Sequence, residues 1–409
     1  MMSDYTWQFT PLDTWFFRES RPMESVGSSL LNSVFPPSPR TMSGAIRTLL
    51  GEHHNVNWET YTEEKVFEVL HRQIGDAYSM GDMRIRGPWV TRYIVDDKKS
   101  EVASSSEGGS WQRLYPAPAN LLYQHVNDKL QRVIRLEVGE PLDCDLGKKV
   151  RMPTIPKMFE KVENIKPRND VWISKETLEA FLSGKDILAD SLVFSSALYD
   201  SEDRLGIARD YQSRTARKSM LYQTSHLRLN RQVGLEVDVL GVKIDQPEKG
   251  LVRLGGEGRM ASFAIAESLD TDICIPRINE KTNGLTITLL TPMGLSGQVD
   301  RSSPLPGFQK ASENGQTVWK GVVENQKMTL HSAAMGKAIR EGGWNLAKRK
   351  PRSVKSLTPA GSTFYLTVDS GDLKGAMDAV HLKQLGQDDM DMALGRGLMV
   401  AGLWQASEY

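Results

Sequence analysis

The sequence predicts an α+β fold in two domains. Its 409 residues exceed what one ordinary core holds. Strand-like and helix-like segments succeed one another twice along the chain, on either side of the polar stretch PRINEKTNG at 276–284. Each series has the order of a split βαβ unit. We therefore expect a first domain over residues 1–280, with an irregular insertion at about 75–190, and a second domain over residues 281–409.

The first domain is predicted to open with a strand and a capped helix. The segment YTWQFTPL at 5–12 is strand-like, and the helix follows within FPPSPRTMSGAIRTLLG at 35–51. Ser38 is a good N-cap, and Pro39 suits the first helical position. One face of the helix is apolar because its apolar residues recur at i, i+3, i+4, i+7 and i+8: Met42, Ala45, Ile46, Leu49 and Leu50.

Periodicity and turn residues predict the remaining elements. In the first domain we expect, in order, an amphipathic helix at 55–74, a strand at 83–95 interrupted at Gly87-Pro88, a flexible loop at 100–110, an irregular stretch or projecting hairpin at 140–170, a helix at 174–184 capped by Ser174, and strands from 192 onward. In the second domain we expect a strand from 285, possible helices at 330–340 and 373–385, a strand at 361–369 and a glycine-rich end.

Composition and cysteine use favour a soluble protein in a reducing compartment. Apolar residues make up 39% and charged residues 25% of the chain, as in soluble globular proteins. No apolar run approaches the ~18 residues of a membrane-spanning helix, and the start MMSDYTWQFTPLD lacks a signal-peptide pattern. Cys144 and Cys274 lie far apart and form no CxxC motif, which argues against a disulfide framework. We expect a cytoplasmic protein that does not contact a membrane.

The sequence contains no motif for a catalytic, metal or cofactor site. The seven histidines include no HxxxH or HExxH spacing, and GxSxG and Walker A motifs are absent. His53 and His54 are expected to help end the first helix rather than to bind a metal. The glycine-rich stretches GGEGR at 255–259 and GRG at 395–397 lack the Rossmann arrangement. We therefore expect no enzyme activity, no metal and no cofactor.

Basic residues are concentrated in two segments although the net charge is zero. Seven Lys or Arg and one acid lie between Arg204 and Arg231, and seven basic residues and one acid lie between Lys337 and Lys355. Such segments are either solvated faces or surfaces for a polyanion. Within the second segment, Lys348, Arg349 and Lys350 are candidates to clamp a polyanion.

The predicted first helix presents a second pattern on its polar face. Arg40 and Arg47 lie seven residues apart and flank two small residues, Ser43 and Gly44. Together these four residues define a shallow notch between two cations. The notch favours the close approach of a phosphate backbone, since arginine pairs with phosphate oxygens. The alternative is that Gly44 is small because a neighbouring strand of the same chain crosses there.

Glycines beside arginines form two further candidate contacts. Gly255, Gly256 and Gly258 precede Arg259, and Arg396 lies between Gly395 and Gly397. Glycine lets a backbone approach a ligand closely, and its amide can donate to a phosphate oxygen. Each loop alone is more often a turn or a bulge than a ligand contact. Together with the notch, they suggest a sugar-phosphate chain held by several loops.

Five blocks of the sequence resemble the subunit-three RAMP proteins of the Cmr complex, the type III-B CRISPR effector. They occur in the family's order and span most of the chain, although residues 52–190 fall outside the resemblance. The blocks are PLDTWFFRESRP followed by the helix segment at 11–51, DRLGIARDYQSRTARKSMLYQTSHLRL at 203–229, LGGEGRMA at 254–261, GGWNLAKRKPRSVKSLTPAGSTFYL at 342–366 and LGRGLMVAGLW at 394–404.

The resemblance implies two ferredoxin-like, RRM-type domains with glycine-rich loops. It also implies a non-catalytic subunit that holds the 5′ handle of the guide RNA. Its implied partners are the large polymerase/cyclase-like subunit, the neighbouring backbone RAMP subunit and, indirectly, the target RNA. Carried onto this chain, the implied handle contacts are Arg18, Arg21, Arg40, Arg47, Arg209, Arg214, Lys218, Gly256 and Arg259.

Two other functions stay open at this point. The first is a RAMP-type endoribonuclease that processes repeat RNA by histidine chemistry, with His53, His54 and His226 as the residues to test. The resemblance shows no matching histidine pair, which argues against it. The second is a protein-binding adaptor whose basic segments pair with acidic partner surfaces.

Overall fold

The structure is a computed structural model that describes residues 4–20, 30–61, 63, 65–95, 109–127, 129–210, 212–243, 247–267, 273–295, 300, 302–345, 349–386 and 388–405. Two compact units interleave along the chain. The first unit comprises Met1–Arg113, Ser195–Asp270 and Arg340–Lys355, and the second comprises Leu114–Phe194, Thr271–Ile339 and Ser356–Tyr409. The predicted boundary near residue 280 separates two successive domains, and it stays a prediction.

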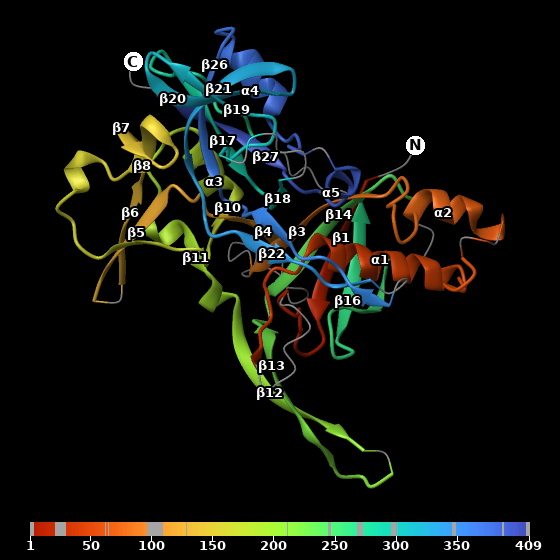
Figure 1. The fold of residues 1–409 in the computed structure, drawn as a ribbon. Helices are drawn as coiled ribbons and strands as arrows, with labels where there is room; N and C mark the ends of the chain where they lie inside the picture. Colours follow the sequence, from red (N-terminus) through yellow and green to blue (C-terminus); the bar gives the residue numbers. More distant parts are fainter. Residues whose placement is uncertain are drawn as a thin grey trace, which may run out of the picture. The chain divides into compact units, whose positions relative to one another are not determined.

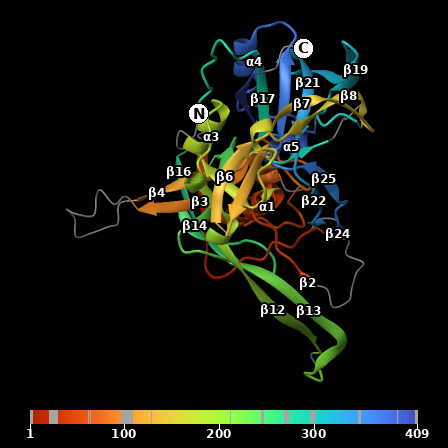
Figure 2. The same cartoon turned by 90° about the vertical axis from the view of Figure 1, so that its left-hand side faces the viewer.

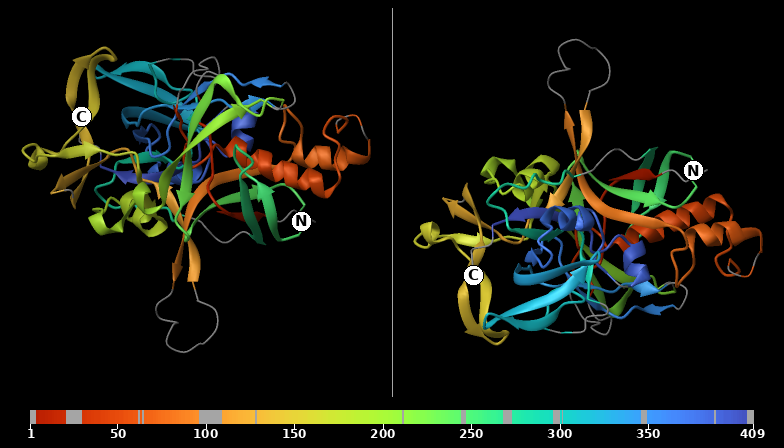
Figure 3. Two further views of the ribbon diagram at one scale, coloured as in Figure 1. Left: turned by 90° about the horizontal axis from the view of Figure 1, so that it is seen from below. Right: turned by 90° about the horizontal axis from the view of Figure 1, so that it is seen from above.

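An antiparallel sheet forms the centre of the first unit (Figure 1). In spatial order its strands are β4 (Gly109–Pro116, which continues into the second unit), β3 (Arg84–Val95), β14 (Val233–Leu240), β1 (Tyr5–Pro11), β16 (Met260–Glu267) and β15 (Lys249–Arg253). Trp7 pairs with Val237 on one side and with Ile265 on the other. The strands predicted at 5–12 and 83–95 are confirmed, and β3 continues through Gly87-Pro88 with a shift in register. The ends of β3 and β4 extend from the sheet as an arm (orange in Figure 3).

Helix α1 (Pro39–His53) packs against β3 and β15. The predicted cap is confirmed, because the Ser38 hydroxyl accepts a hydrogen bond from the Arg40 amide at 3.1 Å. Met42, Ile46 and Leu50 are buried, as their spacing predicts. His54 caps the end of α1, which agrees with the expected role of the two histidines.

The helix predicted at 55–74 is wrong in its first half. Of the residues that the structure describes in this range, only η1 (Lys65–Phe67) and α2 (Glu68–Ile74) are helical. Before them the chain turns, because the Asn57 side chain accepts from the Glu59 amide at 3.1 Å and so competes with helix formation. These turns place the Trp58 ring against Gly51 of α1, where a Cβ atom would lie only 2.3 Å from the ring.

A long two-stranded ribbon extends from the first unit (Figures 1 and 2). It consists of β12 (Tyr199–Arg209) and β13 (Ala216–Leu229), joined by a turn at residues 210–215. The short strand β2 (Leu30–Leu31) runs parallel to β13 at the base of the ribbon. Strands were predicted from residue 192 onward, but a hairpin of this length was not predicted.

The second unit has its own antiparallel sheet and helices. The sheet order is β19 (Gln309–Glu313), β20 (Gln316–Val323), β21 (Gln326–Ala334), β26 (Thr363–Val368), β17 (Gly284–Leu289) and β27 (Met399–Trp404). Helix α4 (Leu373–Val380) contacts β17, β26 and β27, and buries Met377 against Phe308 and Phe364. The strands predicted from 285 and at 361–369 are confirmed, and the helix predicted at 373–385 is confirmed with an earlier end.

Smaller elements complete both units. They are β5 (Leu121–Val126), β6 (Lys129–Arg135), β7 (Glu137–Cys144), β8 (Gly147–Thr154), η3 (Lys157–Phe159), β9 (Ile165–Pro167), β10 (Val171–Ser174), α3 (Lys175–Leu182), η4 (Ala189–Ser191), β11 (Leu192–Phe194), η5 (Ser195–Ala197), β18 (Met293–Gly294), β22 (Ile339–Glu341), β23 (Trp344–Asn345), β24 (Lys350–Pro351), β25 (Lys355–Thr358) and α5 (Asp389–Ala393).

Three further predictions can be compared with these elements. The Ser174 cap of α3 is confirmed, since its hydroxyl accepts from the Thr177 amide at 3.3 Å. The predicted hairpin at 140–170 is β7–β8, and β8 packs against β20 and β21 rather than projecting. The helix predicted at 330–340 is wrong: residues 326–334 form the central strand β21, whose two faces are both buried, so no alternation marks it as a strand.

Candidate nucleic-acid interface

Arginines of α1 form the first candidate contact. Arg40, Gly44 and Arg47 lie at i, i+4 and i+7 and therefore follow one line along the helix. The Arg47 guanidinium is largely buried and donates from Nη2 to the Asp76 carbonyl at 2.6 Å. The Arg40 Nε lies 3.8 Å from the Glu341 carboxylate, which also accepts from the Ser38 hydroxyl at 2.7 Å. These contacts hold both cations in place along the helix.

Gly44 lies between these arginines and is exposed. A Cβ atom built at this position meets nothing within 4 Å. Within the described residues, therefore, no strand of the chain crosses there, and the alternative explanation for a small residue is wrong. A glycine inside a helix costs roughly 0.5–1 kcal/mol relative to alanine. In the described part of the chain, no packing contact at Gly44 accounts for that cost.

Ser43 does not contribute to the notch. Its side chain is only 3% exposed, and its hydroxyl donates to the Arg40 carbonyl at 3.0 Å. Ser43 follows Met42 directly and turns toward the buried side of α1. The predicted RNA contact at Ser43 is therefore replaced by a structural role within the helix.

Arg352 and Tyr61 join this group, and the sequence did not single them out. The Tyr61 ring packs on His71, whose Nε2 lies 3.4 Å from the Asp76 carboxylate, and the Asp76 carbonyl accepts from Arg47. The positive charge of Arg352 helps to lower the pKa of Arg47. Arg352 belongs to the basic segment at 348–355, which was predicted to bind a polyanion. The residues singled out there were Lys348, Arg349 and Lys350. Arg349 and Lys350 are exposed, and Lys348 lies outside the described residues. We call Arg40, Gly44, Arg47 and Arg352 the helix cluster.

The glycine loop between β15 and β16 packs against the chain itself. The Gly256 amide donates to the Phe16 carbonyl at 2.8 Å, and a Cβ atom at Gly255 would lie 2.8 Å from that same oxygen. Gly255 also has a φ of +93°, which disfavours any side chain. These two glycines are thus explained by a turn and a close approach. Gly258, with a φ of +65°, has open space at its Cβ position.

Arg259 is part of a network of charges at the base of the ribbon. Its Nη1 lies 3.3 Å from Asp13, which also receives Arg204 and Arg228 at 3.1 Å each. Glu202 pairs with Arg204 at 2.6 Å and with Arg228. The Arg204 hydrogen bond, helped by Arg228, holds the pKa of Asp13 below its ordinary value. We call these residues the ribbon cluster: Asp13, Glu202, Arg204, Arg228 and Arg259.

The remaining predicted contacts fall into three groups. Arg18 is exposed before β2, and Arg214 is exposed in the turn of the ribbon with a φ of 56°. Arg209 and Lys218 belong to β12 and β13, but their side chains lie outside the described residues, as does Arg21 entirely. Arg396 is only 2% exposed and lies 3.5 Å from Asp391. Its guanidinium is paired within the chain, so the contact predicted there is corrected to a buried ion pair.

The histidines do not form an obvious acid–base site. His226 is 1% exposed, stacks on Phe16 with ring centres 5.1 Å apart and bonds to Thr14 and Thr224 at 3.2 Å each. Both ring nitrogens are therefore bonded within the chain. The exposed His53 and His54 rings lie 5.3 Å apart at the end of α1. In the described part of the chain, no group of three or more His, Cys, Asp or Glu side chains could hold a metal ion.

The environment of His226 predicts a dependence of stability on pH. Burial, with the nearby charges of Arg204 and Arg259, lowers its pKa below the usual 6.5. The unfolded chain then binds a proton that the folded chain does not, so stability should fall as the pH drops below 6.5. Urea unfolding measured at several pH values below 6.5 gives the unfolding free energy as a function of pH. This free energy should change less steeply with pH for His226→Gln, because glutamine does not titrate. Equal slopes for the two proteins would contradict the assignment.

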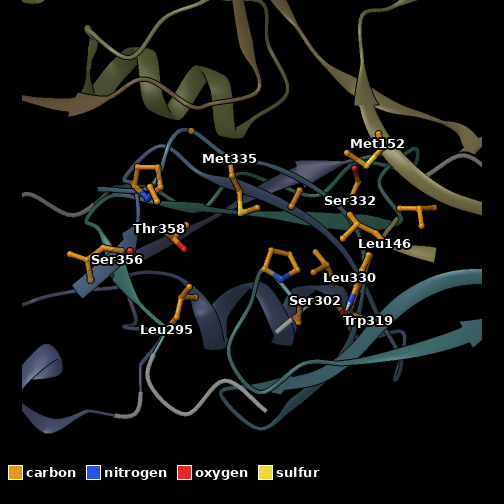
Figure 4. A pocket seen from close by; sticks show the side chains of 18 of the residues that line it. Leu146, Met152, Leu295, Ser302, Trp319, Leu330, Ser332, Met335, Ser356 and Thr358 are labelled. Atoms are coloured by element: carbon orange, nitrogen blue, oxygen red, sulfur yellow. Dashed lines mark hydrogen bonds between the residues drawn. The ribbon is translucent and has the colours of Figure 1, made fainter. Parts of the chain in front are cut away.

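The second unit contains a cavity of a different character (Figure 4). It has a volume of about 370 Å³ and is lined mostly by apolar side chains, including Leu330, Met335 and Leu357. Arg151 is the cation at its wall, and its Nε donates to Gln316 at 3.1 Å. An apolar lining of this kind does not suit a polyanion.

None of the helices in the described ranges is long and apolar enough to cross a membrane.

Comparisons with known proteins find one matching family and several similar structures. The family described as "CRISPR-associated protein (Cas_Cmr3)" matches residues 7–404. No curated protein matches the chain. A chain of the Type III-B Cmr-beta complex bound to cognate target RNA is 14% identical, with a TM-score of 0.46 and 96% of each chain covered. The same complex with AMPPnP gives 15% identity and a TM-score of 0.45 over 88% of this chain and 86% of that one. A chain of the Csm3-Csm4 subcomplex in the type III-A CRISPR-Cas interference complex is 12% identical, with a TM-score of 0.39. The match covers 99% of this chain and 100% of that one.

Proposed function

The chain belongs to the Cas_Cmr3 family of CRISPR-associated proteins, and from this membership we propose that it is a non-catalytic subunit of a type III-B effector that binds the 5′ handle of the guide RNA. One observation carries the proposal beyond the family. The helix cluster places an exposed glycine between two arginines, and nothing in the described chain approaches it. A phosphate backbone would use both the charge and the space.

The two sheets support a ferredoxin-like origin for both domains. In the first unit the order β16-β1-β14-β3 places the first strand between the last and the third, with α1 following β1. In the second unit β27-β17-β26-β21 has the same order, with α4 between β26 and β27. This is the 4-1-3-2 order of the split βαβ unit, with helices at one of the two helical connections in each case. We propose the boundary near residue 280 on this basis.

The proposed protein partners are the large polymerase/cyclase-like subunit and the neighbouring backbone RAMP subunit, with the target RNA reached indirectly. The ribbon supports a partner surface, because Leu205 and Ile207 of β12 are well exposed on one of its faces. Exposed aliphatic side chains at adjacent positions of one face are typical of contact surfaces. We propose that the assembled complex is cytoplasmic.

Purification of the tagged chain from its native host tests this function. Bound RNA is sequenced, and bound proteins are identified by mass spectrometry. We expect short RNAs with a uniform 5′ end, together with a large subunit and other RAMP proteins. Recovery of the proteins without RNA would favour the adaptor function. Recovery of unprocessed repeat RNA whose cleavage depends on His53 or His54 would favour the nuclease.

Gly44 provides a matched pair of substitutions. Gly44→Ala should raise the free energy of unfolding by about 0.5–1 kcal/mol, because alanine fits the open position and costs less chain entropy. Gly44→Leu should also fold, yet weaken RNA binding about 10-fold or more, because a large side chain fills the notch. Thermal unfolding and fluorescence anisotropy with guide RNA measure the two effects.

Lys374→Leu is the control for this pair. Lys374 is exposed on helix α4 of the second unit and lies outside the helix cluster. It should change neither folding nor RNA binding. If Gly44→Leu bound RNA as tightly as Lys374→Leu, the notch would have no part in binding.

A further inference from the structure

Three hydrogen-bond donors beside the helix cluster share an unusual property. The Tyr61 hydroxyl, the Arg47 Nε and the Arg352 Nε are buried, and each is without a hydrogen-bond partner in the described part of the chain. Tyr61 itself is only 4% exposed. Its ring is held by Trp58 at 5.3 Å and by His71 at 5.5 Å between centres, so the hydroxyl has a fixed position.

Buried donors of this kind are costly. A buried polar group without a partner loses its hydrogen bonds to water without replacement, and a charged group loses more solvation still. Folded proteins satisfy nearly all such groups, so three in one neighbourhood need a physical explanation. Among the described residues, the Arg47 guanidinium has one acceptor, the Asp76 carbonyl, which binds Nη2 rather than Nε.

The charges around these donors point in the same direction. Burial lowers the pKa of Arg47, and the neighbouring charges of Arg352 and Arg40 lower it further. Three cations are thus close together, opposed by the carboxylates of Asp76 and Glu341. Burial also raises the pKa of Tyr61 to about 12, so its hydroxyl keeps its proton and remains a donor.

We propose that Tyr61, Arg47 and Arg352 form a binding site for a single phosphate group, which is one phosphodiester of the guide RNA. The inference rests on the proposed function and adds two residues to it. Arginine suits phosphate because its planar fork pairs with two oxygens, and a neutral hydroxyl adds a third direction. Arg47 belongs both to the notch and to this site, so a strand held in the notch would bring its phosphates to the same side of the helix.

The test measures binding of a short single-stranded RNA carrying the recovered 5′ handle to the full-length chain, over a series of salt concentrations. Tyr61→Phe removes only the hydroxyl and should weaken binding about 10-fold with an unchanged salt slope. Arg352→Gln should weaken binding similarly and lower the log–log salt slope by about 0.7. Because both residues hold one phosphate, their combined loss should be smaller than the product of the separate losses.

Two controls separate binding from folding. Tyr123 in β5 also has a buried hydroxyl without a partner in the described chain, and Tyr123→Phe should leave RNA binding unchanged. In the absence of RNA, Tyr61→Phe should unfold at the same or a higher temperature, since it removes an unsatisfied hydroxyl. A purely structural role for Tyr61 predicts the reverse: lower stability with equal affinity.

The outcomes distinguish this site from the general function. If the wild-type chain binds no handle RNA, both the function and the site are wrong. If it binds RNA and Tyr61→Phe and Arg352→Gln both behave like Tyr123→Phe, the phosphate site alone is wrong. If both variants bind RNA normally but lose an acidic partner protein, the group held is a carboxylate, which overturns the proposal.

Discussion

Replacing Arg40 and Arg47 together by glutamine is expected to reduce the affinity for guide RNA by about 100-fold or more. Each arginine would lose charge-assisted hydrogen bonds to phosphate, and such bonds contribute about 1.5–3 kcal/mol each. The log–log salt slope should fall by about 1.4, which is 0.7 for each contact on a single strand. Anisotropy titrations at several salt concentrations measure both quantities.

The control for this double variant removes the same charge elsewhere in the first unit. Arg84 and Arg86 are exposed on β3, and their replacement by glutamine should leave the salt slope nearly unchanged. Because Arg47 also bonds to the Asp76 carbonyl, thermal unfolding must accompany the titrations. A normal salt slope in the Arg40/Arg47 variant would remove the notch from RNA binding.

The second large effect concerns folding rather than RNA. Arg113 is 8% exposed and donates to Glu236 at 2.6 Å and to Asp238 at 3.0 Å. Asp238 also accepts from Thr6 at 3.0 Å and from Trp89 at 3.1 Å. Replacing Arg113 by methionine leaves two carboxylates buried without their cation. We expect a loss of about 3–5 kcal/mol in the free energy of unfolding.

The loss should depend on pH in a defined direction. Burial raises the pKa of Glu236, and Arg113 opposes that shift in the wild type. Without Arg113 the pKa should rise further, so ionised Glu236 destabilises the folded chain at neutral pH. Stability of the variant should therefore partly recover as the pH falls toward the usual glutamate value of 4.5.

Urea unfolding of Arg113→Met at neutral and acidic pH tests this account. Arg92→Met is the control, because Arg92 is only partly buried and bonds to the neutral Gln112 side chain. It should change the unfolding free energy by less than about 0.5 kcal/mol. Equal stabilities of the two variants would show that the buried charges are satisfied in another way.

Local signals predicted much of the fold. The Ser38 and Ser174 caps and the apolar spacing of α1 are properties of neighbouring residues, and they located these helices correctly. The failures were of another kind. Residues 326–334 form a strand because β20 and β26 flank them, and the turn at Asn57 ends a periodic stretch that otherwise resembles a helix. Both depend on context that a local pattern does not contain.

The candidate site could be predicted only in part. The line of Arg40, Gly44 and Arg47 follows from helix geometry, and the open space at Gly44 agrees with it. Arg352 comes from a distant part of the chain, and Tyr61 returns to α1 through turns that were not predicted, so spacing could not pair them with Arg47. The same holds for Asp13, which joins three arginines of the ribbon cluster. The RNA contact predicted at Arg396 is wrong because Arg396 is buried in an ion pair with Asp391.

Ultraviolet crosslinking of the guide RNA within the purified native complex, with crosslinked peptides identified by mass spectrometry, tests the central claim most directly. The claim is that the helix cluster holds guide RNA. The account predicts crosslinks in peptides that contain residues 40–47 and 349–352, near the uniform 5′ end of the RNA. Crosslinks to other subunits alone, with these peptides unmodified, would contradict it.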